Sequence, residues 1–155
     1  MPDAERDAAE RIGGALTEAG MARMPSRVFA ALMVDDDGRM TSSELGAFLD
    51  ASPAGISGAV KYLAHIGVVR RERDRGSRRD VYVVDDDAWR GSMMQHERLY
   101  GPIRLALERA ASMLDDGGPA HRRLDLALEF LVFLEGELDA LDEKWQQYKA
   151  ERGLG

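Results

Sequence analysis

The run of residues 52–84 constrains the fold more than any other part of the chain. Ser52 can cap the start of a helix, and Pro53 suits the first turn, where a missing N–H costs nothing. Residues 68–73 and 81–84 are two β-type runs on either side of a glycine-containing turn, which is typical of a hairpin. A helix that continues directly into a hairpin indicates a mainly α fold with a small β-wing.

Charge is distributed unevenly along the sequence. The whole chain of 155 residues has a formal net charge of −7, but residues 52–80 contain seven Lys and Arg against three acids. Binding to a polyanion responds to the local field more than to the total charge. The segregation therefore favours a nucleic-acid partner despite the overall acidity.

The expected helix has two faces of different character. Its core face is apolar and consists of Ile56, Ala59, Val60, Leu63 and Ile66. Its outer face consists of Ala54, Ser57, Gly58 and Lys61, with Tyr62 and His65 at the margins. Small residues would let the outer face approach the floor of a DNA major groove, which is about 12 Å wide. Ser57 could then bond a base or a phosphate, and Lys61 a guanine edge or a phosphate. The alternative is an ordinary amphipathic surface helix.

Arginines surround the turn of the expected hairpin. Arg75, Arg78 and Arg79 bracket Gly76-Ser77. Arginines at a hairpin tip suit insertion into a narrow minor groove or contact with flanking phosphates, although a solvated turn would have the same composition. The arginines of the first strand have no assigned use, because a glutamate lies among them.

Three short helices are expected before this segment. Asp3–Ala19 has helical spacing and a mostly alanine stripe that includes Ile12 and Leu16, as expected for an arm that lies on a partner. Ser26–Val34 is a second apolar helix. The Thr-Ser-Ser-Glu sequence at 41–44 forms a capping box that opens the third.

The pattern from Asp85 to the end is helical. Pro102 removes a backbone hydrogen bond, which predicts a kink, and Gly117-Gly118-Pro119 predicts a break. The last helix carries apolar residues at alternating spacings of three and four, as in a coiled-coil seam: Leu124, Ala127, Leu131, Leu134, Leu138, Leu141, Trp145 and Tyr148. Phe130 and Phe133 give the same helix a second apolar face. We expect one face to pack on its own domain and the other on another chain. The residues expected at a dimer interface are Ile12, Leu16, Leu131, Leu134, Leu138, Leu141 and Trp145.

Residues 35–44 partly resemble a calcium-binding EF-hand loop. Counting back from Glu44 as the twelfth position places Met33 at the first, and a thioether is not a ligand for a hard cation. We therefore expect no metal site here.

No catalytic chemistry is indicated elsewhere. The three histidines are isolated, there is no cysteine, and no nucleophile or phosphate-binding motif is recognisable. We expect a protein that is not an enzyme and uses no cofactor. No apolar run approaches the roughly 18 residues that a membrane span needs, and the charged N-terminus is unlike a secretory signal. A cytoplasmic location without a membrane partner is expected.

A cluster of soft and aromatic residues opens the first of the C-terminal helices: Trp89, Met93, His96 and Tyr100. Such groups can line a pocket for a small apolar effector. Plain core packing at a domain junction is the alternative.

The order of helices, recognition helix, wing and long helices resembles the MarR family of bacterial winged-helix transcriptional regulators. The stretch from Met24-Pro25-Ser26-Arg27-Val28 through SPAGISGAVKYLAHIGVVRRERDRGSRRDVYVV is most similar to the GbsR-like branch of that family. The similarity covers residues 21–84, while the flanking helices agree in arrangement more than in sequence.

The resemblance implies a winged helix-turn-helix DNA-binding domain at 21–85 and helical dimerisation regions at 1–20 and 86–155. It implies a homodimer that regulates transcription by binding a pseudo-palindromic operator in double-stranded DNA, often as a repressor released by a small-molecule effector. The family's DNA contacts would fall on Ser52, Ala54, Ser57, Gly58, Lys61, Tyr62, Arg75, Arg78 and Arg79.

Two departures from the family pattern concern the wing. Ser77 stands where many MarR wings carry an acid before an Arg pair, and Asp85-Asp86 replaces a common Leu-Thr. They leave the internal ion pairing of the wing open. The alternative function is a winged-helix protein–protein interaction module without DNA binding, whose heptad helix pairs with a different chain.

Overall fold

The computed structural model describes residues 2–73, 76, 79–94 and 96–154, without the side chains at 2, 3, 92–94 and 96–99. The chain divides into two compact units, Met1–Trp89 and Arg90–Gly155. Each unit is described below by itself.

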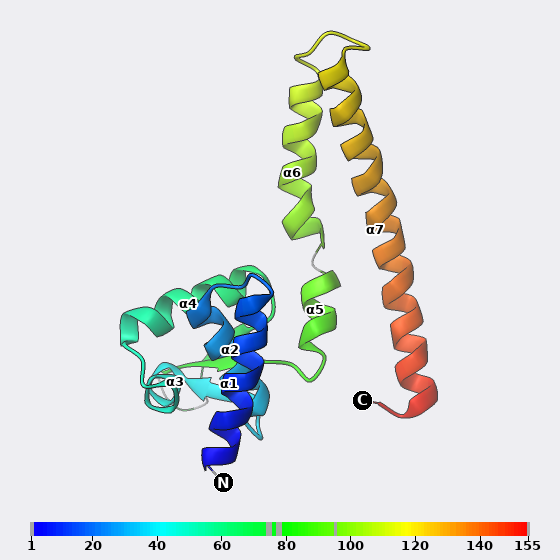
Figure 1. Cartoon of the computed structure of the whole chain (residues 1–155). Helices are drawn as coiled ribbons and strands as arrows, with labels where there is room; N and C mark the ends of the chain where they lie inside the picture. The colour runs from blue at the N-terminus through cyan, green and yellow to red at the C-terminus, as the bar shows by residue number, and fades with distance from the viewer. Residues whose placement is uncertain (1, 74–75, 77–78, 95, 155) are drawn as a thin grey trace. The chain divides into compact units, whose positions relative to one another are not determined.

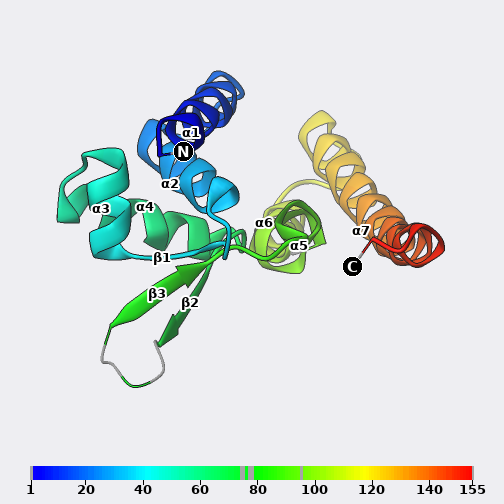
Figure 2. The same cartoon turned by 90° about the horizontal axis from the view of Figure 1, so that it is seen from below.

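The first unit combines four helices with a three-stranded antiparallel sheet (Figure 1). Its elements are α1 (Pro2–Glu18), α2 (Arg23–Val34), β1 (Arg39–Thr41), α3 (Ser42–Leu49), α4 (Pro53–His65), β2 (Arg70–Arg73) and β3 (Asp80–Val83). The strand order is β1-β3-β2, so β3 is central. Figure 2 shows β2 and β3 reaching away from the helices of this unit. The mainly α fold with a small β-wing, predicted from the sequence, is confirmed.

The local signals at the helix starts act as predicted. The Thr41 side chain accepts a hydrogen bond from the Glu44 N–H, and Glu44 accepts one from the Thr41 N–H, which completes the capping box of α3. Ser52 accepts from the Gly55 N–H at the start of α4, with Pro53 in the first turn. Gly67, after the end of α4, has a φ of +78°, a conformation that favours glycine.

Two features of this unit differ from the sequence expectation. The acidic turn before α3 is followed by β1, a third strand in which Met40 lies opposite Tyr82 of β3. Helix α2 begins at Arg23 rather than at Ser26, so Pro25 lies within its first turn. Backbone N–H groups of a first turn have no partner within the helix, so proline fits there.

The core of the first unit lies between α2, α3, α4 and the sheet. Its fully buried large side chains include Phe29, Leu32, Leu45, Ile56 and Leu63. Ser26 is also buried, and its hydroxyl donates to the Ala22 carbonyl at 2.9 Å, so its polar group is satisfied.

The second unit is a helical hairpin. It contains α6 (His96–Ala111) and α7 (Pro119–Arg152). The boundary between the two units, after Trp89, lies within α5 (Ala88–Met94). Helix α6 continues through Pro102, and the kink expected there stays a prediction. In the part of the chain that is described, no helix combines the length and the apolarity that a membrane span requires.

Ion pairs show which side of α7 faces the preceding helices. Arg90 donates to Asp142 at 2.8 Å, and Arg104 Nε lies 3.7 Å from Glu135 Oε1. Glu135 and Asp142 share a face with Leu131, since they follow it by four and eleven residues. Leu131 is the buried residue of α7, which places the seam predicted from the heptads partly within the hairpin itself.

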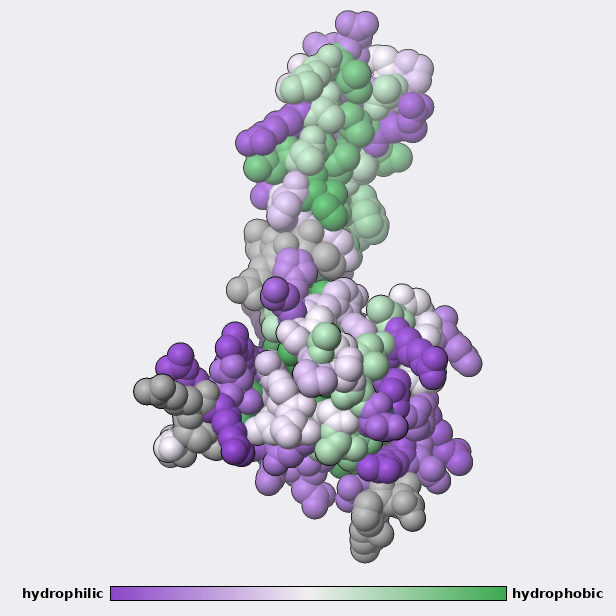
Figure 3. All heavy atoms as spheres, turned by 90° about the vertical axis from the view of Figure 1, so that its left-hand side faces the viewer, coloured by the Kyte–Doolittle hydropathy of each residue, from purple (hydrophilic) through white to green (hydrophobic). Residues whose placement is uncertain are grey.

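A second apolar face of α7 remains exposed. Leu126, Phe130 and Phe133 are 73%, 58% and 63% exposed and lie together on one side of the helix. Figure 3 shows apolar side chains gathered along the side of the α6–α7 hairpin that faces the viewer. Two helices alone cannot bury this much apolar surface, and exposed patches of this kind mark interaction sites.

Candidate nucleic-acid interface

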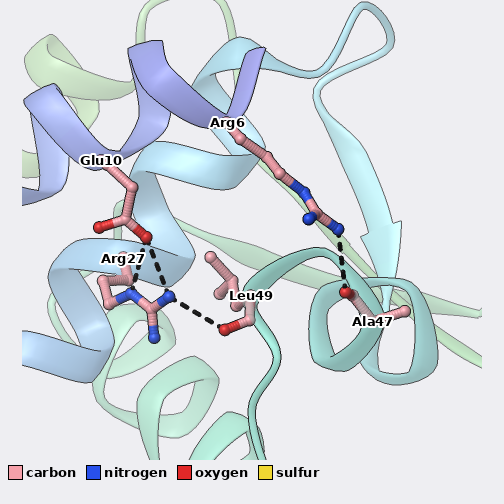
Figure 4. A network of polar contacts seen from close by, with 5 residues as sticks. All are labelled: Arg6, Glu10, Arg27, Ala47 and Leu49. Atoms are coloured by element: carbon pink, nitrogen blue, oxygen red, sulfur yellow. Dashed lines mark hydrogen bonds and ion pairs between the residues drawn. The ribbon is translucent and has the colours of Figure 1, made fainter. Parts of the chain in front are cut away.

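The turn that leads into α4 is fixed by arginines from two helices (Figure 4). Arg27 of α2 donates to the Leu49 carbonyl at the end of α3 at 2.9 Å and to Glu10 of α1 at 2.9 and 3.2 Å. Arg6 of α1 donates to the Ala47 carbonyl at 3.4 Å. These bonds satisfy carbonyls that have no partner within α3 and place positive charge at its negative end. The start of α4 is thereby held in a fixed position.

The two faces of α4 separate as predicted. Ile56, Ala59, Val60 and Leu63 are buried, and Ile66 is half-buried against the core. Ser52, Ala54, Ser57, Gly58, Lys61 and Tyr62 are all exposed. No atom lies within 4 Å of the position that a Cβ would take at Gly58. The centre of the outer face therefore has free space around it and no protruding side chain. The exposed face has the small profile that entry into a major groove requires.

Arg70 of β2 is engaged within the wing. Its guanidinium donates to Asp85 at 2.6 and 3.1 Å and to Glu72 at 2.7 Å, and the bond to Asp85 raises the pKa of Arg70. Asp85 belongs to the acidic pair that departs from the family pattern. Asp85 thus forms an ion pair within the wing, and Arg70 has a structural role there.

Arg71 faces the other side of the sheet. It lies opposite Tyr82 of β3, which is buried in the core, whereas Arg70 lies opposite Val83. Arg71 donates to Asp80, and this bond raises the pKa of Arg71 and lowers that of Asp80. No role for Arg71 could be predicted from the sequence. Its side chain lies on the α4 side of the sheet because of the register between β2 and β3, which the sequence pattern does not specify.

Of the three wing arginines predicted to contact DNA, the structure describes Arg79. Arg79 is exposed and lines a hollow of about 380 Å³ together with Thr41, Ser42, Ser43 and Asp80. Arg79 therefore lies beside the hydroxyl groups that open α3, and its positive charge contributes to the lowered pKa of Glu44, behind the hydrogen bonds from Thr41. Arg75 and Arg78 lie outside the described residues.

The sheet face opposite α4 carries charges of both signs. A hollow of about 550 Å³ there is lined by Asp37, Glu44 and Glu72 as well as by Arg39 and Arg73. Such a mixture gives little net attraction for a polyanion. The α4 side of the wing is the better surface for nucleic acid.

Two carboxylates of the loop at residues 35–44 accept hydrogen bonds from backbone N–H groups. Asp35 accepts from the Arg39 N–H at 3.0 Å and Glu44 from the Thr41 N–H at 2.7 Å. Among the residues that the structure describes, no group of three or more His, Asp or Glu side chains could hold a metal ion.

The residues expected around an effector lie in both units. Trp89 is half-exposed and packs edge-to-face on Phe29, with ring centroids 5.4 Å apart. Tyr100 of α6 is half-buried. The side chains of Met93 and His96 lie outside the described residues, so a pocket formed by the four residues stays a prediction.

The residues expected at a dimer interface have mixed surroundings. Ile12 is half-buried, and Leu16 packs against the core of its own unit. Leu134, Leu138 and Trp145 are half-buried, and Leu141 is 49% exposed. The more exposed apolar side chains of α7 are those of its second face.

Comparison with known proteins gives a partial family match and a fold. A family model described as an MmpR5-like MarR family transcriptional regulator matches residues 87–148. This range excludes α4 and the wing, so it carries no information on the GbsR-like branch expected from residues 21–84. No curated protein sequence matches the chain.

One solved structure superposes closely on the chain. It is described as a transcriptional regulator, with a TM-score of 0.83 and 24% identity over 92% of this chain and 98% of that one. AbsC, a MarR family regulator from Streptomyces coelicolor, has a TM-score of 0.44 and 18% identity over 92% and 86% of the two chains. The regulator Tm0710 from Thermotoga maritima has a TM-score of 0.40 and 18% identity over 90% and 89%. The first of these establishes the winged-helix fold.

Proposed function

We propose that this chain is a dimeric, sequence-specific DNA-binding transcriptional regulator of the MarR family. The observation that carries the proposal is the exposed, small-residue outer face of α4 beside a basic wing. The MmpR5-like match over residues 87–148 and the winged-helix fold support it. Residues Ser52, Ala54, Ser57, Gly58, Lys61 and Tyr62 of α4 and Arg75, Arg78 and Arg79 of the wing would contact DNA.

The second unit supports dimerisation. The apolar face at Leu126, Phe130 and Phe133 needs a cover, and a second copy of the same chain offers a matching surface. Two copies related by a two-fold axis would present two α4 helices to half-sites about one helical turn, roughly 34 Å, apart. A pseudo-palindromic operator is the site that such a pair would read.

We further propose that the regulator is a repressor and that a small molecule releases it from the operator. Trp89, one of the residues expected around the effector, is 48% exposed and is one of two tryptophans in the chain, so its fluorescence would change if a ligand bound beside it. Compounds that shift both the tryptophan fluorescence and the operator affinity would identify the effector class. A regulator that no metabolite affects would instead be constitutive or respond to a protein.

DNA binding is tested with duplexes from the promoter region of its own gene. We expect retardation that weakens steeply with salt, with a log–log slope of about −0.9 for each neutralised phosphate. Lys61→Ala should weaken operator binding, because Lys61 would contact a guanine edge or a phosphate. Arg11→Ala, an exposed arginine of α1, removes the same charge away from α4 and should leave binding unchanged.

Two results would count against the proposal. Binding that is absent, or independent of salt, would remove the DNA-binding role. A dimer in light scattering that ignores DNA would favour the protein-interaction module instead.

A further inference from the structure

A groove lies between the recognition helix and the wing. Its volume is about 170 Å³, and it is lined by Ser57, Val60, Lys61, Ala64, Arg71 and Tyr82. The first four of these residues belong to α4, and the last two belong to β2 and β3. The groove is therefore walled by both elements that would contact DNA.

The lining separates into a polar rim and an apolar floor. Val60 and Tyr82 are buried, whereas Ser57, Lys61 and Arg71 are exposed. The rim offers a hydroxyl, an ammonium and a guanidinium, all of which donate hydrogen bonds to anionic oxygens. Two cations and a hydroxyl around a small open groove suit a singly charged tetrahedral anion.

Asp80 directs Arg71 without filling the groove. It accepts a hydrogen bond from one terminal nitrogen of the guanidinium, and it lines the separate hollow beside Arg79 rather than the groove itself. A guanidinium has five N–H donors in a fixed plane, so one engaged nitrogen orients the others. Arg71 is thus held in place at the rim.

DNA geometry brings a phosphate to this position. If α4 enters a major groove and the wing approaches the next minor groove, the sugar–phosphate backbone that divides them must pass between helix and wing. We propose that the groove binds one backbone phosphate of DNA, with Arg71, Lys61 and Ser57 as its ligands. This rests on the proposed DNA-binding function and assigns Arg71 a role as a phosphate-positioning residue.

Adjacent arginines of β2 provide a matched test. Arg71→Ala and Arg70→Ala remove the same charge one residue apart, but Arg70 faces the other side of the sheet and is held by Asp85 and Glu72. Binding of each variant to the same duplex is measured by fluorescence anisotropy from 50 to 300 mM salt. We expect the log–log salt slope to decrease in magnitude by about 0.9 for Arg71→Ala and to stay at the wild-type value for Arg70→Ala.

Further readouts separate a phosphate contact from other roles. Arg71→Ala should weaken operator and scrambled duplexes by the same factor, since a phosphate carries no sequence information. Arg71→Lys should restore the slope, because it restores the charge. Thermal melting of each variant checks that the fold is retained.

The outcomes distinguish this inference from the function on which it rests. Equal slope changes in Arg70→Ala and Arg71→Ala, with wild-type binding intact, would overturn the phosphate site alone. A loss confined to the operator sequence would make Arg71 a base-reading residue and would also overturn it. Wild-type protein that does not bind DNA would remove both proposals.

Discussion

Thr41 and Glu44 exchange two hydrogen bonds at the start of α3, and these bonds join the wing to the helices. Thr41 is both the last residue of β1 and the cap of α3. A cap residue satisfies an N–H group that has no partner within the helix. The same pair therefore ends a strand and begins a helix that packs beneath α4.

Replacement of Thr41 tests this junction. We expect Thr41→Ala to destabilise the first unit by about 1 kcal/mol, the usual loss for a helix cap. Thr41→Ser keeps the oxygen and should retain most of the stability. Urea unfolding followed by circular dichroism measures both, and equal stability of the alanine and serine variants would contradict a capping role.

The capping box also predicts a dependence on pH. Hydrogen bonds from Thr41, backbone first, lower the pKa of Glu44 below its ordinary value of 4.5. A lowered folded-state pKa contributes stability above the unfolded-state pKa, and this stability is lost as the pH falls through the folded-state value. Glu44→Gln should remove this contribution and flatten the loss of stability below about pH 4.5, where the Glu44 carboxylate would otherwise titrate. Melting temperatures of the variant and the wild-type protein from pH 3 to 7 measure the difference.

Residue roles could be predicted from the sequence where their partners are near in the chain. The bonds of Thr41 and Ser52 span three residues, so local spacing was sufficient to predict them. The bond between Arg70 and Asp85 spans fifteen residues and depends on strand register, which the sequence pattern does not specify. The same register separates the roles of Arg70 and Arg71.

At the scale of elements, the close approach of α1 and α2 depends on small side chains. Ala9 and Gly13 of α1 are buried, and a Cβ at Gly13 would lie 3.4 Å from the Arg27 Cα. The alanine stripe of the sequence predicted close approach to a partner. In the structure, α2 of the same chain provides this contact, and the ion pair of Arg27 with Glu10 is formed across it.

Adjacent glycines of α1 test the packing. Gly13→Leu should push α1 from α2 and destabilise the first unit by about 1–3 kcal/mol, as overpacking does. Gly14 has nothing within 4 Å of a Cβ position, so Gly14→Leu should be neutral or slightly stabilising because leucine favours helices. Thermal unfolding compares the two, and an equal effect would show that the helix contact at Gly13 does not matter.

Helices and strands could be predicted where an apolar pattern repeats over many residues, and less well where an element forms only by pairing with a distant strand. Helix α7 has a continuous heptad pattern over most of its 34 residues, and its start after Gly118 was marked by proline. Strand β1 has three residues, too few for a pattern, and forms because Met40 pairs with Tyr82. Helix α6 continues through Pro102, so the lost backbone bond does not end the helix, and the expected kink stays a prediction.

At the scale of the whole molecule, the two units differ in how far each is complete by itself. The first has a buried core that extends over α2, α3, α4 and the sheet. The described part of the second has Ala111 and Leu131 as its buried apolar residues, while many large apolar side chains are exposed. The first unit buries a core of its own, whereas the second leaves a large apolar face exposed, and this difference supports the proposed dimer.

The exposed face of α7 predicts a dimer that depends on Phe130. Phe130→Glu would place a charge at the centre of the face formed with Leu126 and Phe133, and aromatic residues at interface centres are worth about 2 kcal/mol or more. We expect the dissociation constant of the dimer to rise by at least about 30-fold, as this free energy implies. Phe130→Leu preserves an apolar contact and should remain dimeric. Light scattering over a concentration series measures the change, and operator affinity should fall with it, because one half-site alone would be bound. A glutamate variant that stays fully dimeric at low concentration would place the interface elsewhere on the hairpin.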